Sequence, residues 1–196
     1  MLITSKRSIR LMQSLGIGVV AAVASALAIQ PVAAQNSAKA PTSGVELLQR
    51  MHDRYAKSWY RTLSFTQTTD IRLPTDSVIQ QTWWETASIP GYLLIRRLTN
   101  DDKNAAIYRK DSVYSRRNGA PWQGRQARND LMVLGFDVYR QPVDVSAEVL
   151  RGEGYDLSKV SEGTWDGRPA WVVGAPKGDS TSRQFWIDKE RLVYVH

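Results

Sequence analysis

Apolar residues follow a helical period early in the chain and a period of two over most of what comes after. Over residues 44–59 an apolar side chain recurs every three or four positions, which predicts an amphipathic helix. This stripe consists of Val45, Leu48, Met51, Tyr55 and Trp59. Ser43 and Glu46 form the signature of a capping box, and they predict where the helix begins.

From Leu63 onward, short segments alternate apolar and polar residues between turn residues. Such spacing is typical of an antiparallel sheet. The predicted strands cover residues 63–69, 78–87, 92–96, 105–109, 112–115, 156–165, 168–175, 182–187 and 191–196. Two helical segments interrupt them, over 126–139 and 145–150, and Asp144 is the expected cap of the second. Because the sequence stops on an apolar strand, we expect a form that is incomplete at its C-terminus.

The first 34 residues have the pattern of a secretory signal peptide. Lys6, Arg7 and Arg10 precede an uncharged run over 15–29, and small residues then lead to a cleavage site after Ala34. We therefore predict export to a bacterial periplasm, a flexible N-terminus over 35–42 and a single domain over 43–196. The chain has no cysteine, which leaves nothing to lipidate at the cleavage site and no disulfide to form.

The charge of the chain changes once this leader is removed. The full sequence carries a net charge of +7, and the leader holds three basic and no acidic residues, so +4 remains. No run of five basic residues and no RNA-binding signature is present, and we therefore expect no nucleic-acid partner.

Residues that carry chemistry are sparse. The sequence has two histidines and lacks a metal-ligand cluster, a phosphate loop and a nucleophile elbow. We accordingly predict no catalytic residues, no metal, no cofactor and no enzymatic activity. The aspartates at 179 and 188 lie in predicted hairpin turns, where this side chain bonds the local backbone.

Seven tryptophans are the remaining signal, and they allow two interpretations. The strand aromatics can simply pack a sheet against the helices, or they can line an apolar cavity for a ligand. For the second interpretation the candidate ligand-binding residues are Trp83, Leu93, Ile95, Trp171, Val173, Phe185 and Ile187. A register slip of one residue would exchange the two faces of a strand. The sequence alone therefore does not determine which of these side chains point into the cavity.

Three stretches carry a resemblance to a known family: residues 155–158 (YDLS), 164–175 (TWDGRPAWVVGA) and 184–192 (QFWIDKERL). Together with Phe65 and Gln67 after the first helix, and with Pro90-Gly91 after a Trp-Glu strand, they resemble the outer-membrane lipoprotein-sorting proteins. These are relatives of the periplasmic lipoprotein carrier, and we call them LolA-like.

The resemblance implies an α+β fold, in which a strongly curved antiparallel sheet forms an incomplete β-barrel with helices on its concave face. It also implies a soluble periplasmic carrier of hydrophobic ligands. Its partners would be the acyl chains of lipoproteins or other lipids, an inner-membrane transporter and an outer-membrane acceptor.

One position departs from the family pattern. The carrier latches its helical lid with an arginine just before a proline, and Ile89 stands at the corresponding position here. A periplasmic sensor or adaptor of the same fold, which binds a membrane-anchored regulator or lipoprotein, is the alternative function.

Overall fold

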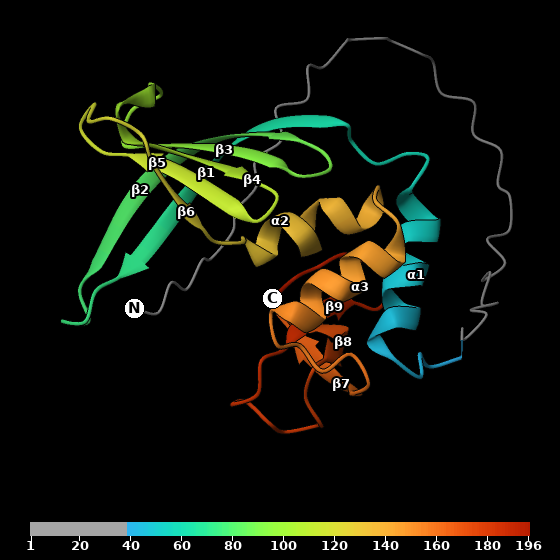
Figure 1. Cartoon of the computed structure of the whole chain (residues 1–196). Helices are drawn as coiled ribbons and strands as arrows, with labels where there is room; N and C mark the ends of the chain where they lie inside the picture. Colours follow the sequence, from blue (N-terminus) through green and yellow to red (C-terminus); the bar gives the residue numbers. More distant parts are fainter. Residues whose placement is uncertain (1–38) are drawn as a thin grey trace, which may run out of the picture.

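Two antiparallel sheets and three α-helices make up residues 39–196, the part of the chain that the computed structural model describes (Figure 1). The predicted signal peptide and residues 35–38 lie outside the described residues. The α-helices are α1 (Gly44–Tyr55), α2 (Asp130–Gly135) and α3 (Val143–Gly152). Short 3-10 helices cover Asp102–Asn104 and Asp137–Tyr139. The predicted α+β class is confirmed.

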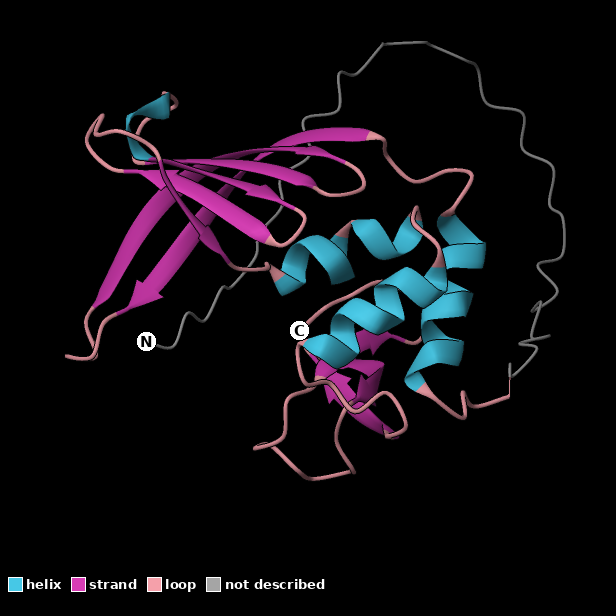
Figure 2. Cartoon of the chain, viewed as in Figure 1, coloured by secondary structure: helices cyan, strands magenta, loops and turns pink. Residues whose placement is uncertain are grey.

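The strands form two sheets and not one. The first is a six-stranded meander in the order β1-β2-β3-β4-β5-β6, and the second has the order β7-β8-β9. The first sheet comprises β1 (Thr62–Arg72), β2 (Val78–Ser88), β3 (Tyr92–Arg97), β4 (Ala105–Arg109), β5 (Ser112–Arg116) and β6 (Gln123–Gln126). The second comprises β7 (Val160–Trp165), β8 (Arg168–Val173) and β9 (Phe185–Asp188). The helices lie between the two sheets (Figure 2).

Each sheet packs one face against the helices, because alternation along the strands places apolar side chains on that face. In the six-stranded sheet we call the face that meets α2 the inner face, and the opposite face the outer face. The second sheet buries Val173, Phe185 and Ile187 against α1 and α3 in the larger of two apolar clusters. The helix residues of that cluster include Leu47, Leu48, Met51, Ala147 and Leu150.

Helix α1 begins where the capping pattern predicts, but only half of the box forms. The Ser43 hydroxyl accepts a hydrogen bond from the Glu46 N–H at 3.2 Å. The Glu46 carboxylate binds Thr42 instead of Ser43, and it accepts from the Thr42 N–H at 2.8 Å and from its hydroxyl at 2.9 Å. These bonds hold the pKa of Glu46 at about 2.

Several elements differ from the predictions. The predicted helix over 126–139 divides into α2 and the 3-10 helix Asp137–Tyr139, and the predicted strands over 156–165 and 182–187 begin only at Val160 and Phe185. Helix α1 ends at Tyr55, four residues early, and the chain turns so that Trp59 packs against both apolar clusters. Strand β6 was not predicted, since its four exposed residues have no apolar alternation and pairing with β5 alone makes it a strand. Asp144 does not cap α3. The helix begins at Val143, after Pro142, and no side chain caps it.

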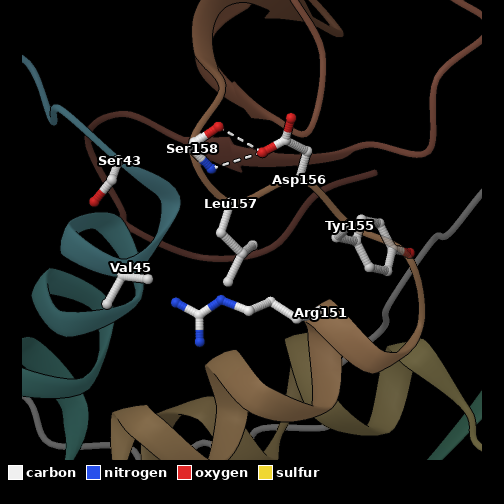
Figure 3. A pocket seen from close by; sticks show the side chains of 7 residues that line it. All are labelled: Ser43, Val45, Arg151, Tyr155, Asp156, Leu157 and Ser158. Carbon is white, nitrogen blue, oxygen red and sulfur yellow. Dashed lines mark hydrogen bonds between the residues drawn. The ribbon is translucent and has the colours of Figure 1, made fainter.

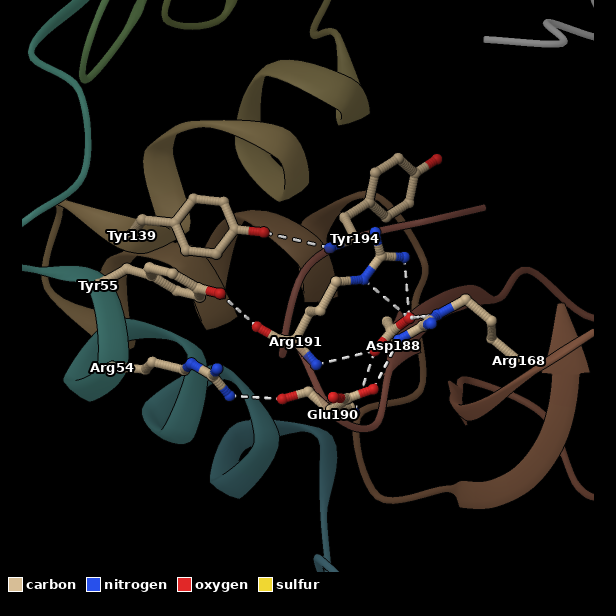
Figure 4. A network of polar contacts seen from close by, with 8 residues as sticks. All are labelled: Arg54, Tyr55, Tyr139, Arg168, Asp188, Glu190, Arg191 and Tyr194. Carbon is tan, nitrogen blue, oxygen red and sulfur yellow. Dashed lines mark hydrogen bonds and ion pairs between the residues drawn. The ribbon is translucent and has the colours of Figure 1, made fainter. Parts of the chain in front are cut away.

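The predicted strand over 191–196 is present only as hydrogen bonds and one bridge. Tyr194 bridges to Ile187, and Val195 donates to the carbonyl of Trp186 at 2.9 Å. Helix α1 holds the same segment from the other side, because the Arg54 guanidinium and the Tyr55 hydroxyl donate to the carbonyls of residues 190 and 191 (Figure 4).

Asp188 is the centre of this network, and it is only 2% exposed. It accepts from the backbone N–H groups of Glu190 and Arg191 at 3.0 and 2.8 Å, which confirms its predicted role in a turn. It also accepts from Arg168 at 2.7 Å and from the Arg191 side chain at 2.8 Å. Burial by itself would raise the pKa of Asp188, but these bonds lower it far below its ordinary value.

We expect Asp188→Asn to destabilise the protein by about 3 kcal/mol, because it leaves two guanidinium groups beside a buried site without their carboxylate. Urea unfolding of the variant and the parent measures the difference. Asp166→Asn, in the exposed turn of the same sheet, is the matched control and should change stability by less than about 0.5 kcal/mol. Equal losses from the two variants would contradict the structural role of Asp188.

Candidate functional site

The inner face of the six-stranded sheet is the best candidate for a ligand site, because two adjoining rows of its side chains run across the strands. Strand register places Leu63, Ala87, Leu93, Tyr108 and Val113 in one row. The neighbouring row contains Phe65, Glu85, Ile95, Ala106 and Ser115. Leu93 and Ile95 are 0% and 4% exposed, so this part of the face is covered.

The cover is α2, a helix of only six residues. Met132 and Phe136 pack into the smaller apolar cluster with Ala87, Leu93 and Ile95. The ring centroids of Phe65 and Phe136 lie 6.1 Å apart.

Helix α2 has a second apolar side. Its residues Val133 and Leu134 belong to the larger cluster, against α1, α3 and the second sheet. An element with apolar residues on both sides must be buried on both sides. The same short helix therefore closes the inner face of one sheet and joins it to the core of the other.

Asp137 ties this segment to the sheet. Its carboxylate accepts a hydrogen bond from the Gly91 N–H, at the turn between β2 and β3, at 3.0 Å. Gly91 has φ +94°, a conformation that glycine adopts without strain. Asp137 is 4% exposed, and burial raises its pKa from 3.8 to about 6 against the opposing effect of the Gly91 hydrogen bond.

Polar contacts also hold the start of α2. Asn129 caps the helix by accepting from the Leu131 N–H at 3.1 Å. Asp130 accepts from the Tyr155 hydroxyl at 2.7 Å and from Arg183 at 2.6 Å, and both donors belong to the second half of the chain. Burial raises the pKa of Tyr155 beyond its ordinary value, and the bond to Asp130 adds to the effect.

Beyond the apolar rows the inner face becomes polar. Gln67 and Thr69 are buried there, and Gln67 donates to the Thr69 hydroxyl at 3.3 Å. Glu85 is buried within the neighbouring row, between Phe65 and Ile95. Arg97 lies opposite Trp83 in the register, and its guanidinium carbon is 4.9 Å from the centre of the indole ring. The face is therefore mainly apolar where α2 covers it, with Glu85 as the buried exception, and polar at its far end.

The structure separates the seven predicted ligand-binding residues into two groups. Trp83, Leu93 and Ile95 share the inner face of the six-stranded sheet with α2. The other four pack with α1 and α3 in the larger cluster; they are Trp171, Val173, Phe185 and Ile187. The seven predicted residues therefore lie in two separate apolar clusters.

Sequence reasoning missed several residues of the inner face. Leu63, Phe65 and Tyr108 contact the α2 cluster, as do Leu131, Met132 and Phe136 from the helical segment itself. Alternation in the first predicted strand contained the signal for Leu63 and Phe65. The spacing of four between Met132 and Phe136 contained the signal for the helix face.

A partly open depression of about 340 Å³ lies elsewhere, between the start of α1 and the end of α3 (Figure 3). Its walls include Val45, Arg151, Leu157 and Asp156, and none of the seven predicted residues lines it. The Asp156 carboxylate is already used by the Ser158 N–H and hydroxyl at 3.0 and 2.6 Å. Asp156 and Ser158 therefore serve the local turn, and we assign no ligand to the depression.

Comparisons of the chain with protein-family models, with curated proteins and with solved structures found no match. Within residues 39–196, no three His, Asp or Glu side chains are grouped so that they could hold a metal ion. No helix in this same range is both long and apolar enough to cross a membrane.

The pKa of Asp137 predicts how stability depends on pH. Because the folded pKa of about 6 lies above the ordinary 3.8, this group favours the folded state below about pH 4, and that contribution is lost as the pH rises through 6. Asp137→Asn keeps an acceptor for the Gly91 N–H without a buried charge. We expect the variant to be about 2 to 3 kcal/mol more stable than the parent near pH 7.

The advantage of Asp137→Asn should disappear toward about pH 4, which denaturant unfolding over this pH range measures. Asp144→Asn replaces an exposed carboxylate in the next helix and should show no such trend. A constant difference across the range would contradict the buried titration of Asp137.

Proposed function

We propose that the protein is a soluble periplasmic carrier of hydrophobic ligands, in which the six-stranded sheet is a half-barrel and its inner face receives an acyl chain. The observation that carries the proposal is the apolar face formed by Leu63, Phe65, Leu93 and Ile95, which a helix of six residues covers. The resemblance to the LolA-like proteins, with helices on the concave face of such a sheet, supports the same function.

A short cover suits a site that must open. Met132 and Phe136 fill the space that an acyl chain would take, so the ligand replaces contacts that the empty protein makes with itself. Just after α2, the Asp137 carboxylate binds the Gly91 N–H of the sheet, and we propose that this bond serves in place of the arginine latch of the LolA-like carrier. Separating α2 from the sheet then costs one hydrogen bond and the contacts of Leu131, Met132 and Phe136. The other side of α2 would stay bound to the second half of the chain through Asp130, Val133 and Leu134.

The free energy of moving an acyl chain out of water favours an apolar binding face for lipid transport. Each buried CH₂ contributes about 0.8 kcal/mol, so a chain of roughly 16 carbons gains about 12 kcal/mol on leaving water. Part of this gain offsets the loss of the α2 contacts, which leaves binding that is tight and still reversible. Transfer of this kind needs an apolar surface and no catalytic groups.

The signal-peptide pattern and the lack of cysteine support a mature protein that is exported and not lipidated at its cleavage site. A protein that moves between two membranes fits this combination. Lipoproteins or other acylated molecules are the cargo that the inner face would accept, and the polar groups beside Trp83 would face the head group.

Adjacent tryptophans on opposite faces provide the test. Trp83 lies on the inner face, and Trp84 lies on the outer face of the same strand. We expect Trp83→Ala to weaken binding of a fluorescent fatty acid about tenfold, since it removes roughly 1.5 kcal/mol of apolar contact. Trp84→Ala is the matched control and should leave the dissociation constant unchanged, as measured by fluorescence titration of the mature protein.

Lipid extraction and native mass spectrometry of protein secreted to the periplasm provide a second measurement, and co-purified acyl species are expected. Equal effects of the two tryptophan variants would place the ligand outside the inner face. A folded parent protein that binds no fatty acid and carries no lipid would overturn the carrier function and favour the sensor or adaptor.

A further inference from the structure

The outer face of the six-stranded sheet carries aromatic and arginine side chains in neighbouring positions, of which Tyr92, Arg109 and Tyr114 are exposed and Arg116 is half-buried. We define the outer patch as Tyr92, Leu94, Ile107, Arg109, Tyr114 and Arg116. Register places Leu94, Ile107 and Tyr114 in one row across β3, β4 and β5, with Tyr92 and Arg109 paired beside it. Tyr92 is 41% exposed and Tyr114 is 43% exposed, so both rings are accessible at this face.

The two arginines of the patch each lie over an aromatic ring, Tyr92 within the patch and Trp122 outside it. The guanidinium carbon of Arg109 is 5.6 Å from the Tyr92 ring centre, and that of Arg116 is 5.4 Å from the ring centre of exposed Trp122. Arg109 and its neighbours Lys110 and Arg117 form no ion pair within 4.0 Å among the described residues. Arg109 therefore presents positive charge on the patch that no ion pair within the described part of the chain neutralises.

Charge is divided unevenly between the two halves of the molecule. Residues 60–128, which contain the six-stranded sheet, hold eleven basic and six acidic residues, for a net charge of +5. Residues 129–196 hold eight basic and eleven acidic residues, for a net charge of −3. An extended negative surface would attract the sheet and repel the other half, so it would orient the whole molecule.

We propose that the outer patch docks the protein on an anionic phospholipid surface, with its arginines on head-group phosphates and its tyrosines at the level of the head groups. Tyrosine and tryptophan prefer this interfacial position, and basic residues beside them add attraction to anionic lipids. The sheet face is broad and offers rows of rings and cations, which suits a lipid surface better than a single peptide. The inner face stays free on the opposite side.

Vesicle sedimentation tests the proposal with the mature protein. We expect binding to vesicles of phosphatidylcholine mixed with phosphatidylglycerol, weaker binding as salt is added, and little binding to phosphatidylcholine alone. The double variant Arg109→Ala with Arg116→Ala should weaken binding roughly 30-fold, since each basic residue near such a surface contributes about fivefold.

Two further double variants test whether binding depends on the position of the charge and on the aromatic rings of the patch. Arg151→Ala with Lys177→Ala removes the same charge from exposed positions in the other half and should change binding less than about threefold. Tyr92→Ala with Tyr114→Ala should reduce the part of the binding that survives added salt. Circular dichroism verifies that each variant is folded.

The docking proposal is independent of the carrier function, and the two can fail separately. Trp83→Ala should bind vesicles as the parent does, even where it loses fatty-acid binding. A parent protein that does not bind anionic vesicles would overturn the proposal. Equal losses of binding from Arg109→Ala with Arg116→Ala and from Arg151→Ala with Lys177→Ala would also overturn it. Binding of an acidic protein by the patch, without vesicle binding, would also overturn it.

Discussion

The contact of α2 with the inner face of the six-stranded sheet is the interaction on which the arrangement of the molecule depends. Met132 and Phe136 fill the sheet side of this contact, and Val133 and Leu134 belong to the core on the other side. Removing either set would expose apolar surface in one sheet and leave the two halves of the chain without their shared element. A short helix can do this because it is apolar on both sides, so burial and not helix propensity keeps it in place.

The same contact explains why a buried carboxylate is tolerated next to an apolar cluster. Asp137 gains one hydrogen bond from Gly91 and loses most of its hydration. Its pKa is raised because the loss of hydration outweighs the hydrogen bond. A group of this kind stabilises a closed position only weakly, which is compatible with a cover that must move. Asp188 is the opposite case, since two arginines and two backbone N–H groups surround it and its pKa falls. The C-terminal segment is accordingly held firmly against α1, while α2 is held to the six-stranded sheet mainly by packing.

Much of the fold was visible in the pattern of residues. Alternation predicted five of the six strands in the first sheet nearly to their observed ends, and the three-to-four spacing predicted α1 together with its Ser43 cap. Strand β6 could not be predicted in this way, because its four residues are exposed and gain their conformation from β5 alone. The early end of α1 was also hidden, since Trp59 continues the apolar stripe although the chain has already turned.

The candidate site was predicted only in part, and the reason is geometric. Strand periodicity marks six of the predicted residues equally well as apolar positions on one face of a strand: Trp83, Leu93, Ile95, Val173, Phe185 and Ile187. It does not tell which of them share a surface. Whether two strands join one sheet depends on long-range hydrogen bonds between backbones, and backbone groups are the same in every residue.

The sequence by itself determined the local elements, the turn aspartates and the large number of tryptophans, because these follow from the spacing and chemistry of neighbouring residues. The tertiary structure alone decided that there are two sheets, that α2 lies between them, and that Tyr92, Arg109 and Tyr114 meet on an exposed face. Those features depend on which distant segments are packed together, and many different pairings would satisfy the same local pattern.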